Sequence, residues 1–311
     1  MGLTLEVSDI MLRSAMGTVI NIDGRLLPPE EATISVLDRG FLYGDSIYEV
    51  IRTYGGRPFE LDAHLDRLEG SAGLIALTLP WDKKRFSEEI QETIRASANI
   101  EAGRETYVRL VVTRGSGEIG LDPALAVKPR TVIISRPLVM PSKECYESGV
   151  EVAVVSVQRV APEAINPAAK TGNYLNNLLA LKEARDRGAY EAVMLDGKGR
   201  LTEGSTSNVF IVKDGKLVTP PTDAGILEGV TRRVILLAAQ DVDIAASQLH
   251  LEPDDLREAD EAFITSSIRE ILPVTRVDGE PVGEGRVGSV TKKLQAAFRE
   301  RTGVPVDGEG F

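Results

Sequence analysis

Cysteine, histidine and long apolar runs are scarce in this sequence of 311 residues. A single cysteine, Cys145, excludes an internal disulfide and any metal cluster built on cysteines. The two histidines, His64 and His250, are far apart and have no cysteines beside them, so they do not indicate a zinc site. No apolar run is long enough to cross a bilayer. These scarcities exclude a disulfide-stapled scaffold, a zinc domain and a membrane-spanning helix.

Positive charge is scarce as well. Acidic residues outnumber basic ones by 47 to 36, which gives a net charge of −11. A chain this acidic has no global electrostatic attraction to nucleic acid. Its first 17 residues carry acidic side chains and lack the basic start and clean apolar core of a signal peptide. We therefore expect a cytoplasmic protein that binds neither nucleic acid nor membrane.

Common catalytic motifs are missing or lie in the wrong context. The sequence contains no P-loop and no G-x-S-x-G nucleophile elbow. GSGEIG at 115–120 matches the dinucleotide-binding pattern G-x-G-x-x-G, which requires a helix to begin there. The residues that follow, LDPALAVKP, contain two prolines and lead into another strand pattern. We therefore interpret 115–120 as a loop and reject the dinucleotide interpretation.

The rest of the sequence interleaves strand and helix patterns. Apolar residues recur at helical spacing over 60–78 and 82–98. Segments 106–115 and 130–138 are typical of strands, and the Asp-Gly pair at 23–24 indicates a tight hairpin. Interspersed helices and strands with repeated hairpins predict an α+β or α/β fold with much antiparallel sheet.

The chain is long enough for two domains. Pro137 and Pro141 lie close together and indicate a linker. We predict a small N-terminal α/β domain over 1–136, a linker over 137–142 and a larger C-terminal domain over 143–311.

The larger domain shows the same alternation of patterns. GVEVAVVSVQRV at 149–160 predicts a strand, and helices are predicted over 173–188, 231–240 and 288–301. One lysine, Lys170, stands in a segment of small residues after a strand and before a helix. Taken alone, Lys170 fits either a surface lysine or a functional amine.

Five segments together narrow the choice. They are DRGFLYGDSIYEVIRTY (38–54), INPAAKTGNYLNNLLALKEA (165–184), LTEGSTSNVFIVKDGKLVTPP (201–221), GILEGVTRRVI (225–235) and ITSSIREILPV (264–274). In this order the chain, from about residue 17 onward, resembles the class IV aminotransferases. The resemblance implies the two-domain fold type IV, also called D-amino-acid aminotransferase-like. It further implies pyridoxal 5'-phosphate (PLP) between the domains, and a homodimer.

The resemblance assigns roles around the cofactor. It implies that the Lys170 amine holds PLP and then moves a proton as general base and acid. Glu203 corresponds to the carboxylate that keeps the pyridine nitrogen protonated. Tyr174 corresponds to the tyrosine that hydrogen-bonds the phenolic oxygen, although K-T-G-N-Y is one residue shorter than in many branched-chain enzymes. The residues implied for the phosphate are Arg67, Val230, Thr231 and Ser267.

The resemblance also assigns a substrate site for amino acids and 2-oxo acids. It implies that Tyr107, Ser267 and Ile268 bind the α-carboxylate and that Arg109 meets the distal carboxylate of glutamate. Residues 107 and 109 of one strand face the same side, so both can line one pocket. The implied apolar contacts are Tyr43, Tyr48 and, from the partner subunit, the loop carrying Ile119 and Leu121.

Two signals compete over the substrate. Residues 109–123 align without gaps to the branched-chain type, and 116–121 lack the arginine and histidine of the D-amino-acid enzymes. In contrast, Tyr48 and Val50 stand where branched-chain enzymes have Phe and Gly, a feature of the D-amino-acid type. We expect transfer of the amino group of L-leucine, L-isoleucine or L-valine to 2-oxoglutarate.

Several alternatives stay open at this point. A D-amino-acid or (R)-amine transaminase of the same fold is the first. An aminodeoxychorismate lyase is less favoured, because that type shares less of 38–54 and 225–235. From another class, a binding protein could keep the fold and lack the chemistry. The joint presence of Lys170, Glu203, Thr231 and Arg67 disfavours this last alternative.

Overall fold

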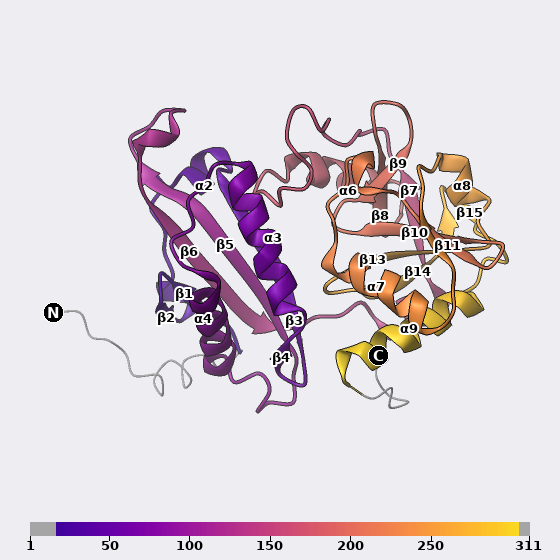
Figure 1. Ribbon diagram of the computed structural model, residues 1–311, viewed down its shortest axis with the longest axis horizontal. Coiled ribbons are helices and arrows are strands. Elements are labelled where there is room, and N and C mark those ends of the chain that lie inside the picture. The colour runs from indigo at the N-terminus through magenta and orange to yellow at the C-terminus, as the bar shows by residue number, and fades with distance from the viewer. Residues whose placement is uncertain (1–16, 305–311) are drawn as a thin grey trace. The chain divides into compact units, whose positions relative to one another are not determined.

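The computed structural model describes residues 17–304. The chain divides into two compact units, each with its own sheet (Figure 1). The first unit takes the described residues up to Val139 together with Ala169–Asn173, and the second takes Met140–Ala168 and the chain from Tyr174 onward. The Lys170 segment therefore belongs with the first sheet, which differs from the single boundary expected from the sequence. The N-terminal stretch in which we expect no signal peptide lies outside the described residues.

An antiparallel sheet of six strands forms the first unit, in the order β2-β1-β6-β5-β3-β4. The strands are β1 Val19–Ile22, β2 Arg25–Leu27, β3 Ser46–Tyr54, β4 Arg57–Pro58, β5 Thr106–Gly117 and β6 Ala126–Pro137. The helices are α2 Arg39–Tyr43, α3 Leu61–Leu74 and α4 Lys83–Ala96. Asp23 and Gly24 between β1 and β2 both have positive φ, which confirms the predicted hairpin.

The two faces of this sheet differ, because successive residues of a strand point to opposite sides. Ile47 and Ile51 of β3 are buried on one face, in a core that α3 and α4 complete with Leu65 and Phe86. Both helices lie over this face (Figure 1), which confirms the helices predicted over 60–78 and 82–98. Burying these apolar side chains stabilises the unit.

The opposite face of the first sheet carries the polar and aromatic residues of β3 and β5. Val50 pairs with Arg109, and Arg52 pairs with Tyr107, so these four side chains share that face. Tyr48 lies two residues before Val50 and has the same orientation. The prediction that residues 107 and 109 face the same side is confirmed.

A larger mixed sheet forms the second unit, in the order β12-β11-β10-β13-β14-β7-β8-β9, with β15 paired to β14. The strands are β7 Val150–Val154, β8 Glu191–Leu195, β9 Leu201–Gly204, β10 Asn208–Lys213, β11 Lys216–Thr219, β12 Ala246–Gln248, β13 Glu261–Ser266, β14 Glu270–Val277 and β15 Glu280–Pro281. The helices are α5 Lys143–Ser148, α6 Leu175–Asp186, α7 Val230–Asp241, α8 Pro253–Arg257 and α9 Ser289–Thr302. Tyr146 of α5 and Leu256 of α8 pack on one side of the sheet.

The structure tests two further predictions, the strand over 149–160 and the loop at 115–120. The strand predicted over 149–160 is shorter, since β7 ends at Val154. The amide and hydroxyl of Ser156 both donate to the Glu183 carboxylate at 2.8 Å, and such side-chain bonds compete with strand pairing. Segment 115–120 runs from β5 into a loop with only a short 3-10 turn at Pro123–Leu125 after it. The rejection of a dinucleotide-binding turn is thereby confirmed.

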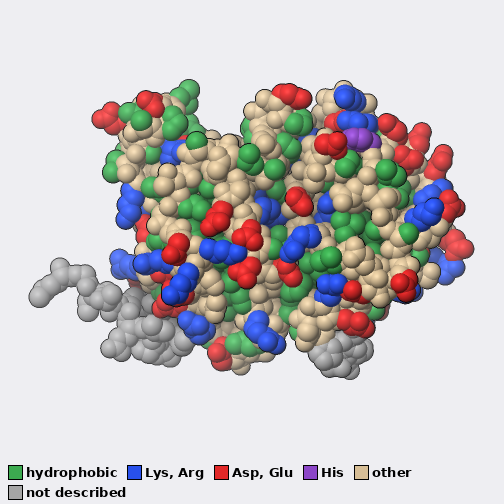
Figure 2. All heavy atoms as spheres, in the orientation of Figure 1, with side chains coloured by type: hydrophobic (Ala, Val, Ile, Leu, Met, Phe, Trp, Pro, Cys, Tyr) green, Lys and Arg blue, Asp and Glu red, His purple; other side chains and the backbone are tan. Residues whose placement is uncertain are grey.

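The visible surface carries charges of both signs. Acidic and basic side chains are interspersed on the face shown in Figure 2, as on an ordinary solvated surface. Within residues 17–304 no helix has both the length and the apolar character needed to cross a membrane.

Candidate active site

Lys170 is fixed to the edge of β3 by backbone hydrogen bonds. The Tyr48 amide donates to the Lys170 carbonyl at 3.0 Å, and the Gly172 amide donates to the Ser46 carbonyl at 2.8 Å. The Lys170 amide in turn donates to Ser71 Oγ on α3 at 3.1 Å. A Cβ at Gly172 would overlap the Ser46 hydroxyl, so a larger residue here would require that side chain to move. The T-G pair after the lysine thus has a structural reason.

Two cations meet one aromatic ring on the face of the first sheet that α3 and α4 do not cover. Lys170 Nζ lies 4.5 Å from the centroid of the Tyr48 ring. The Arg109 guanidinium carbon lies 3.9 Å from the same centroid. Amine, aromatic ring and guanidinium therefore form one cluster, and three of the predicted site residues are brought together.

Behind this cluster, on the helix-covered face, Arg67 is bound by a buried carboxylate. Its Nε and Nη2 donate to the two oxygens of Glu49 at 2.8 and 2.7 Å. His64 Nδ1 lies 2.7 Å from the same carboxylate. Burial by itself would raise the pKa of Glu49, but the charge and hydrogen bonds of Arg67, with those of His64, lower that pKa to about 2. Burial lowers the pKa of His64.

Sequence reasoning missed Glu49, the residue that orients Arg67. Arg67 was expected at the phosphate, and the structure shows how its side chain is held. His64, which the sequence analysis did not assign to a site, is buried in the same group. The helical spacing of 64 and 67 was visible in the sequence, but their shared partner on β3 was not.

In the second unit Glu203 lies at the end of β9 with both oxygens engaged. Oε1 accepts from Arg159 Nε at 2.9 Å, and Oε2 accepts from the Leu227 amide at 2.9 Å. The side chain is only 7% exposed. A carboxylate has about four lone-pair positions, so a further donor can still be bound. Arg159 was not among the predicted residues.

Helix α7 begins three residues after Leu227, whose amide binds Glu203. Gly229 caps the helix without a side-chain hydrogen bond, and Val230 and Thr231 are buried in its first turn. The first N–H groups of a helix have no partner within it and attract anions. Asn208 Nδ2 donates to the Leu227 carbonyl at 3.0 Å and holds the approach to the helix in place.

Ser267 and Ile268 lie in the turn between β13 and β14. The next residue, Arg269, pairs with Glu191 at 3.1 Å and donates to Thr206 Oγ1 at 2.9 Å. The Tyr146 hydroxyl donates to the Arg269 carbonyl at 3.0 Å. The turn of Ser267 and Ile268 is therefore anchored through Arg269.

Glu191 joins two loops of the second unit. It is completely buried at the start of β8 and accepts from the Ser205 amide at 3.1 Å as well as from the Ser205 hydroxyl. Ser205 lies two residues after Glu203. Arg269, the other partner of Glu191, comes directly after Ile268. One buried carboxylate thus connects the loop after Glu203 with the turn of Ser267 and Ile268. No sequence signal indicated this residue.

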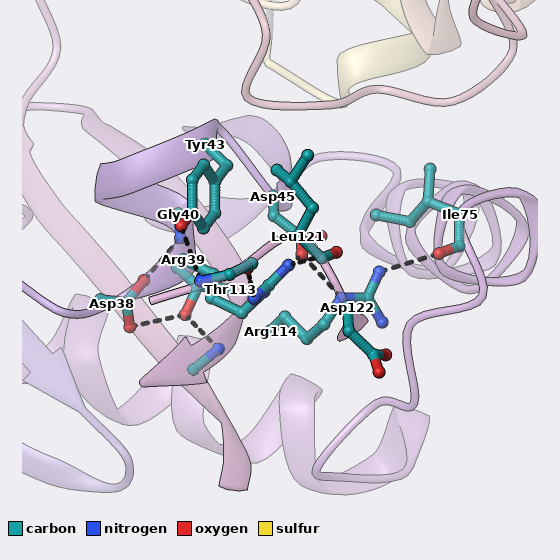
Figure 3. Close-up of polar contacts among 12 residues, drawn as sticks. Asp38, Arg39, Gly40, Tyr43, Asp45, Ile75, Thr113, Arg114, Leu121 and Asp122 are labelled. Carbon is teal, nitrogen blue, oxygen red and sulfur yellow. Dashed lines mark hydrogen bonds and ion pairs between the residues drawn. The ribbon is translucent and has the colours of Figure 1, made fainter. Parts of the chain in front are cut away.

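The loop after β5 is tied back to α2, as Figure 3 shows. The Gly120 amide donates to the Tyr43 hydroxyl at 3.1 Å, and Arg39 donates to the carbonyls of Gly120 and Leu121 at 2.8 and 3.2 Å. Asp45 holds Arg39 through an ion pair of 3.1 Å. The side chains of Ile119 and Leu121 are 74% and 81% exposed. Their predicted role toward a second subunit stays a prediction.

The donors fit PLP in their chemistry. The first unit offers the Lys170 amine, and the second offers the Glu203 carboxylate, the start of α7 and the hydroxyls of Thr231 and Ser267. An amine suits an aldehyde, a carboxylate suits a pyridinium nitrogen, and helix N–H groups suit a phosphate. Tyr174 caps α6, and no described contact tests its predicted role.

Comparison with known proteins agrees with this donor set. The family model described as amino-transferase class IV matches residues 46–277. A protein of Methanocaldococcus jannaschii, provisionally named a branched-chain-amino-acid aminotransferase, is 41% identical over 281 residues, covering 90% of this chain and 95% of its own. A D-alanine aminotransferase of Listeria monocytogenes is 35% identical over 288 residues, covering 90% and 94%.

Solved structures are similar along most of the chain. The branched-chain amino acid aminotransferase of Escherichia coli has a TM-score of 0.86 and 34% identity, covering 91% of this chain and 93% of its own. A branched-chain enzyme from T.th., complexed with N-(5'-phosphopyridoxyl)-L-glutamate, has a TM-score of 0.84 and 30% identity, covering 94% and 96%. Because the family model matches residues 46–277 and the relatives are similar along about nine tenths of the chain, this chain belongs to the class IV aminotransferases, enzymes whose cofactor is PLP.

Proposed function

We propose that this enzyme transfers the amino group of L-leucine, L-isoleucine or L-valine to 2-oxoglutarate, giving branched 2-oxo acids and L-glutamate. The observation that carries the proposal is the cluster of Lys170, Tyr48 and Arg109. A transaminase of this kind must accept an apolar side chain and a carboxylate in one pocket. Arg109 beside the Tyr48 ring supplies a cation next to an apolar surface.

The residues divide the work of the reaction between them. Bound PLP supplies an electron sink for the electron pair released at the substrate Cα. The Lys170 amine takes the Cα proton as a general base and delivers it as a general acid. Glu203, held by Arg159, keeps a proton on the ring nitrogen. The residues we propose for the remaining cofactor contacts are Tyr174, Arg67, Val230, Thr231 and Ser267.

Substrate recognition uses both ends of the amino acid. We assign the α-carboxylate to Tyr107, Ser267 and Ile268, and the distal carboxylate of glutamate to Arg109. A guanidinium binds a carboxylate through two hydrogen bonds and is well suited to this role. The apolar surroundings of the substrate side chain are Tyr43, Tyr48, Ile119 of the partner subunit and Leu121 of the partner subunit.

The last assignment requires a homodimer. Ile119 and Leu121 are highly exposed on a loop whose backbone Arg39 and Tyr43 hold in place. Large exposed apolar side chains on an ordered loop support an interface. We place this homodimer in the cytoplasm, on the sequence argument given above.

A half-reaction panel tests the proposed function. Purified holoenzyme is mixed with single amino donors, and cofactor absorbance reports conversion to the amino form. We expect L-leucine, L-isoleucine, L-valine and L-glutamate to react, and 2-oxoglutarate to restore the starting spectrum. Faster conversion by D-alanine or (R)-amines than by L-leucine would overturn the proposal.

Two observations support a preference for D-amino acids instead. Tyr48 and Val50 occupy the positions at which the sequence resembles the D-amino-acid type, and Val50 lies directly opposite Arg109 in the sheet. A relative named D-alanine aminotransferase matches 90% of the chain, the same share as the branched-chain relative of Methanocaldococcus jannaschii. A D-amino-acid transaminase is therefore the second candidate, and the same panel decides between them.

A further inference from the structure

A network of charged side chains lies in the first unit, where α2, the loop after β5 and the end of α3 meet (Figure 3). At its centre is Asp45, directly before β3. One oxygen of Asp45, Oδ2, accepts from Arg39 Nε at 3.1 Å and from Arg114 Nε at 2.8 Å. Burial by itself would raise the pKa of Asp45, but the hydrogen bonds and charges of Arg114 and Arg39 lower it. The carboxylate is therefore ionised at neutral pH.

Arg39 connects Asp45 to the tip of the loop after β5. Its Nη1 and Nη2 donate to the carbonyls of Gly120 and Leu121 at 2.8 and 3.2 Å. The Gly120 amide donates to the Tyr43 hydroxyl at 3.1 Å. Three backbone groups of the loop tip are thus bound by side chains of α2. These contacts hold one conformation in a segment that has no strand or helix of its own between β5 and the turn at Pro123–Leu125.

The position of Arg39 depends on Asp45. The Arg39 side chain is buried, and within residues 17–304 Asp45 is the only carboxylate with which it forms an ion pair. A buried charge that loses its partner is strongly destabilising, and carbonyl oxygens compensate it only in part. Removing the charge of Asp45 should therefore drive Arg39 towards solvent and release the loop tip.

Arg114 gives Asp45 a second connection, within its own subunit. Arg114 donates to the carbonyls of residues 75–76, directly after α3, at 2.9 and 2.8 Å. Helix α3 carries Ser71, whose hydroxyl accepts from the Lys170 amide. A role in placing the Lys170 of the same chain is therefore the alternative.

The contacts favour the loop as the part that depends on Asp45. The Lys170 segment is held to β3 by backbone hydrogen bonds from the amides of Tyr48 and Gly172, which need no side chain of this network. The three bound groups of the loop tip rely on side chains instead, and Arg39 binds two of them. Loss of the Asp45 charge acts on the loop directly and on the lysine only through α3.

We propose that Asp45 is a positioning residue that acts across the dimer: through Arg39 it holds the loop of Ile119 and Leu121 in the conformation that meets the substrate site of the partner subunit. This inference rests on the proposed function, in which these two side chains border the apolar side chain of a substrate bound to the other subunit. Asp45 itself contacts neither substrate nor cofactor. It determines how tightly the partner subunit binds a leucine-like side chain.

Hybrid dimers test the direction of this effect. Two differently tagged chains are co-expressed, and the mixed holoenzyme is purified through both tags. Lys170→Ala silences one of the two sites, so a single site reacts in each hybrid. In the first hybrid Asp45→Asn is in the chain with the intact lysine, and the reacting site meets an unchanged loop. In the second hybrid Asp45→Asn is in the chain with Lys170→Ala, and the reacting site meets the altered loop.

The two hybrids contain the same substitutions, so a merely structural effect would be equal in both. Each is compared with a control hybrid of Lys170→Ala and the wild type. We expect the second hybrid to have about 10- to 100-fold lower kcat/KM for L-leucine, through a higher KM at nearly unchanged kcat, because a displaced loop no longer contacts the substrate. The first hybrid should match the control.

Asp23→Asn is the matched control for the lost charge. Asp23 lies in the same unit, pairs with Arg130 at 3.3 Å and accepts from the Thr131 amide at 2.8 Å, so its substitution should change neither hybrid. Arg39→Gln tests the same link from the other side and keeps the experiment decisive if Asp45→Asn folds poorly. It removes the donors to the loop carbonyls, leaves Asp45 paired with Arg114, and should again raise KM only in the second hybrid.

A loss confined to the first hybrid would show that Asp45 acts on the Lys170 of its own chain and would overturn the proposal. Equal losses in both hybrids, or no loss in either, would overturn it as well. These outcomes are ratios to the control hybrid. Failure of the proposed function would instead appear in the wild-type donor panel, so the two failures are distinguishable.

Discussion

Removing the charge of Glu49 tests the most strongly perturbed group of the site. Glu49 is completely buried between Arg67 and His64, and its pKa is lowered from the ordinary 4.5 to about 2. Such a shift corresponds to about 3 kcal/mol of stability. Because the pKa is lower in the folded chain, this stability is present above pH 4.5 and is lost as the pH falls towards 2. In Glu49→Gln the side chain cannot titrate, so this contribution is missing at every pH.

Trp81 provides the assay. It is the only tryptophan of the chain, and its ring centroid lies 5.3 Å from that of Phe86 in the core of the same unit. Its fluorescence during urea unfolding therefore reports on the unit that contains Glu49. We expect Glu49→Gln to be less stable than the wild type by about 3–5 kcal/mol at neutral pH, because Arg67 loses its buried partner. The difference should shrink by about 3 kcal/mol as the pH approaches 2.

The control is Glu88→Gln in the same unit. Glu88 is 63% exposed and pairs only loosely with Lys84, at 3.8 Å. It should follow the wild type at every pH, since exposed pairs contribute little. Parallel pH dependence of the wild type and Glu49→Gln would refute the argument that Arg67 and His64 hold Glu49 ionised.

Three further predictions concern the chemistry. Lys170→Ala should keep its fold and lose turnover, and borohydride reduction of the wild type followed by peptide mapping should locate the cofactor on Lys170; an adduct on another lysine contradicts the assignment. Glu203→Gln should retain the cofactor and lower turnover by at least about tenfold, the value of one charge-assisted hydrogen bond; near wild-type turnover would show that the ring nitrogen does not depend on it. Arg109→Ala should reduce kcat/KM by about 10- to 150-fold for L-glutamate and 2-oxoglutarate, and much less for L-leucine. Equal losses would mean that Arg109 is structural or binds the α-carboxylate.

The parts of the site that were predictable from the sequence lie in continuous segments. Lys170 could be identified because its flanking residues form one motif, and the structure gives the motif a reason in the close approach of Gly172 to Ser46. The shared orientation of Tyr107 and Arg109 followed from the two-residue period of a strand. Local chemistry and periodicity were sufficient for these residues.

The supporting residues could not be predicted, because their partners are distant in the sequence. Arg159 reaches Glu203 across 44 positions, and Arg269 reaches Thr206 across 63. Arg39 reaches the Gly120 carbonyl across 81. Pairings of this kind depend on tertiary structure and have no local signal.

The ion pair of Glu191 and Arg269 shows why such supporting residues matter for catalysis. Glu191 is inaccessible to solvent and contacts no proposed substrate or cofactor residue directly, yet it joins the loop after Glu203 to the turn of Ser267 and Ile268. Small displacements of binding groups reduce rates strongly, so this link should control KM as well as stability.

Arg269→Ala leaves a buried carboxylate unpaired and should cost about 3–5 kcal/mol of stability. It should also raise KM for every amino acid, since the turn of Ser267 and Ile268 loses its anchor. Adding Glu191→Gln removes the unpaired charge and should restore much of the thermal stability without restoring KM, because the anchor is still missing. If the double variant recovers KM and stability together, the pair only supports the fold, and the turn is positioned by the Tyr146 hydroxyl alone.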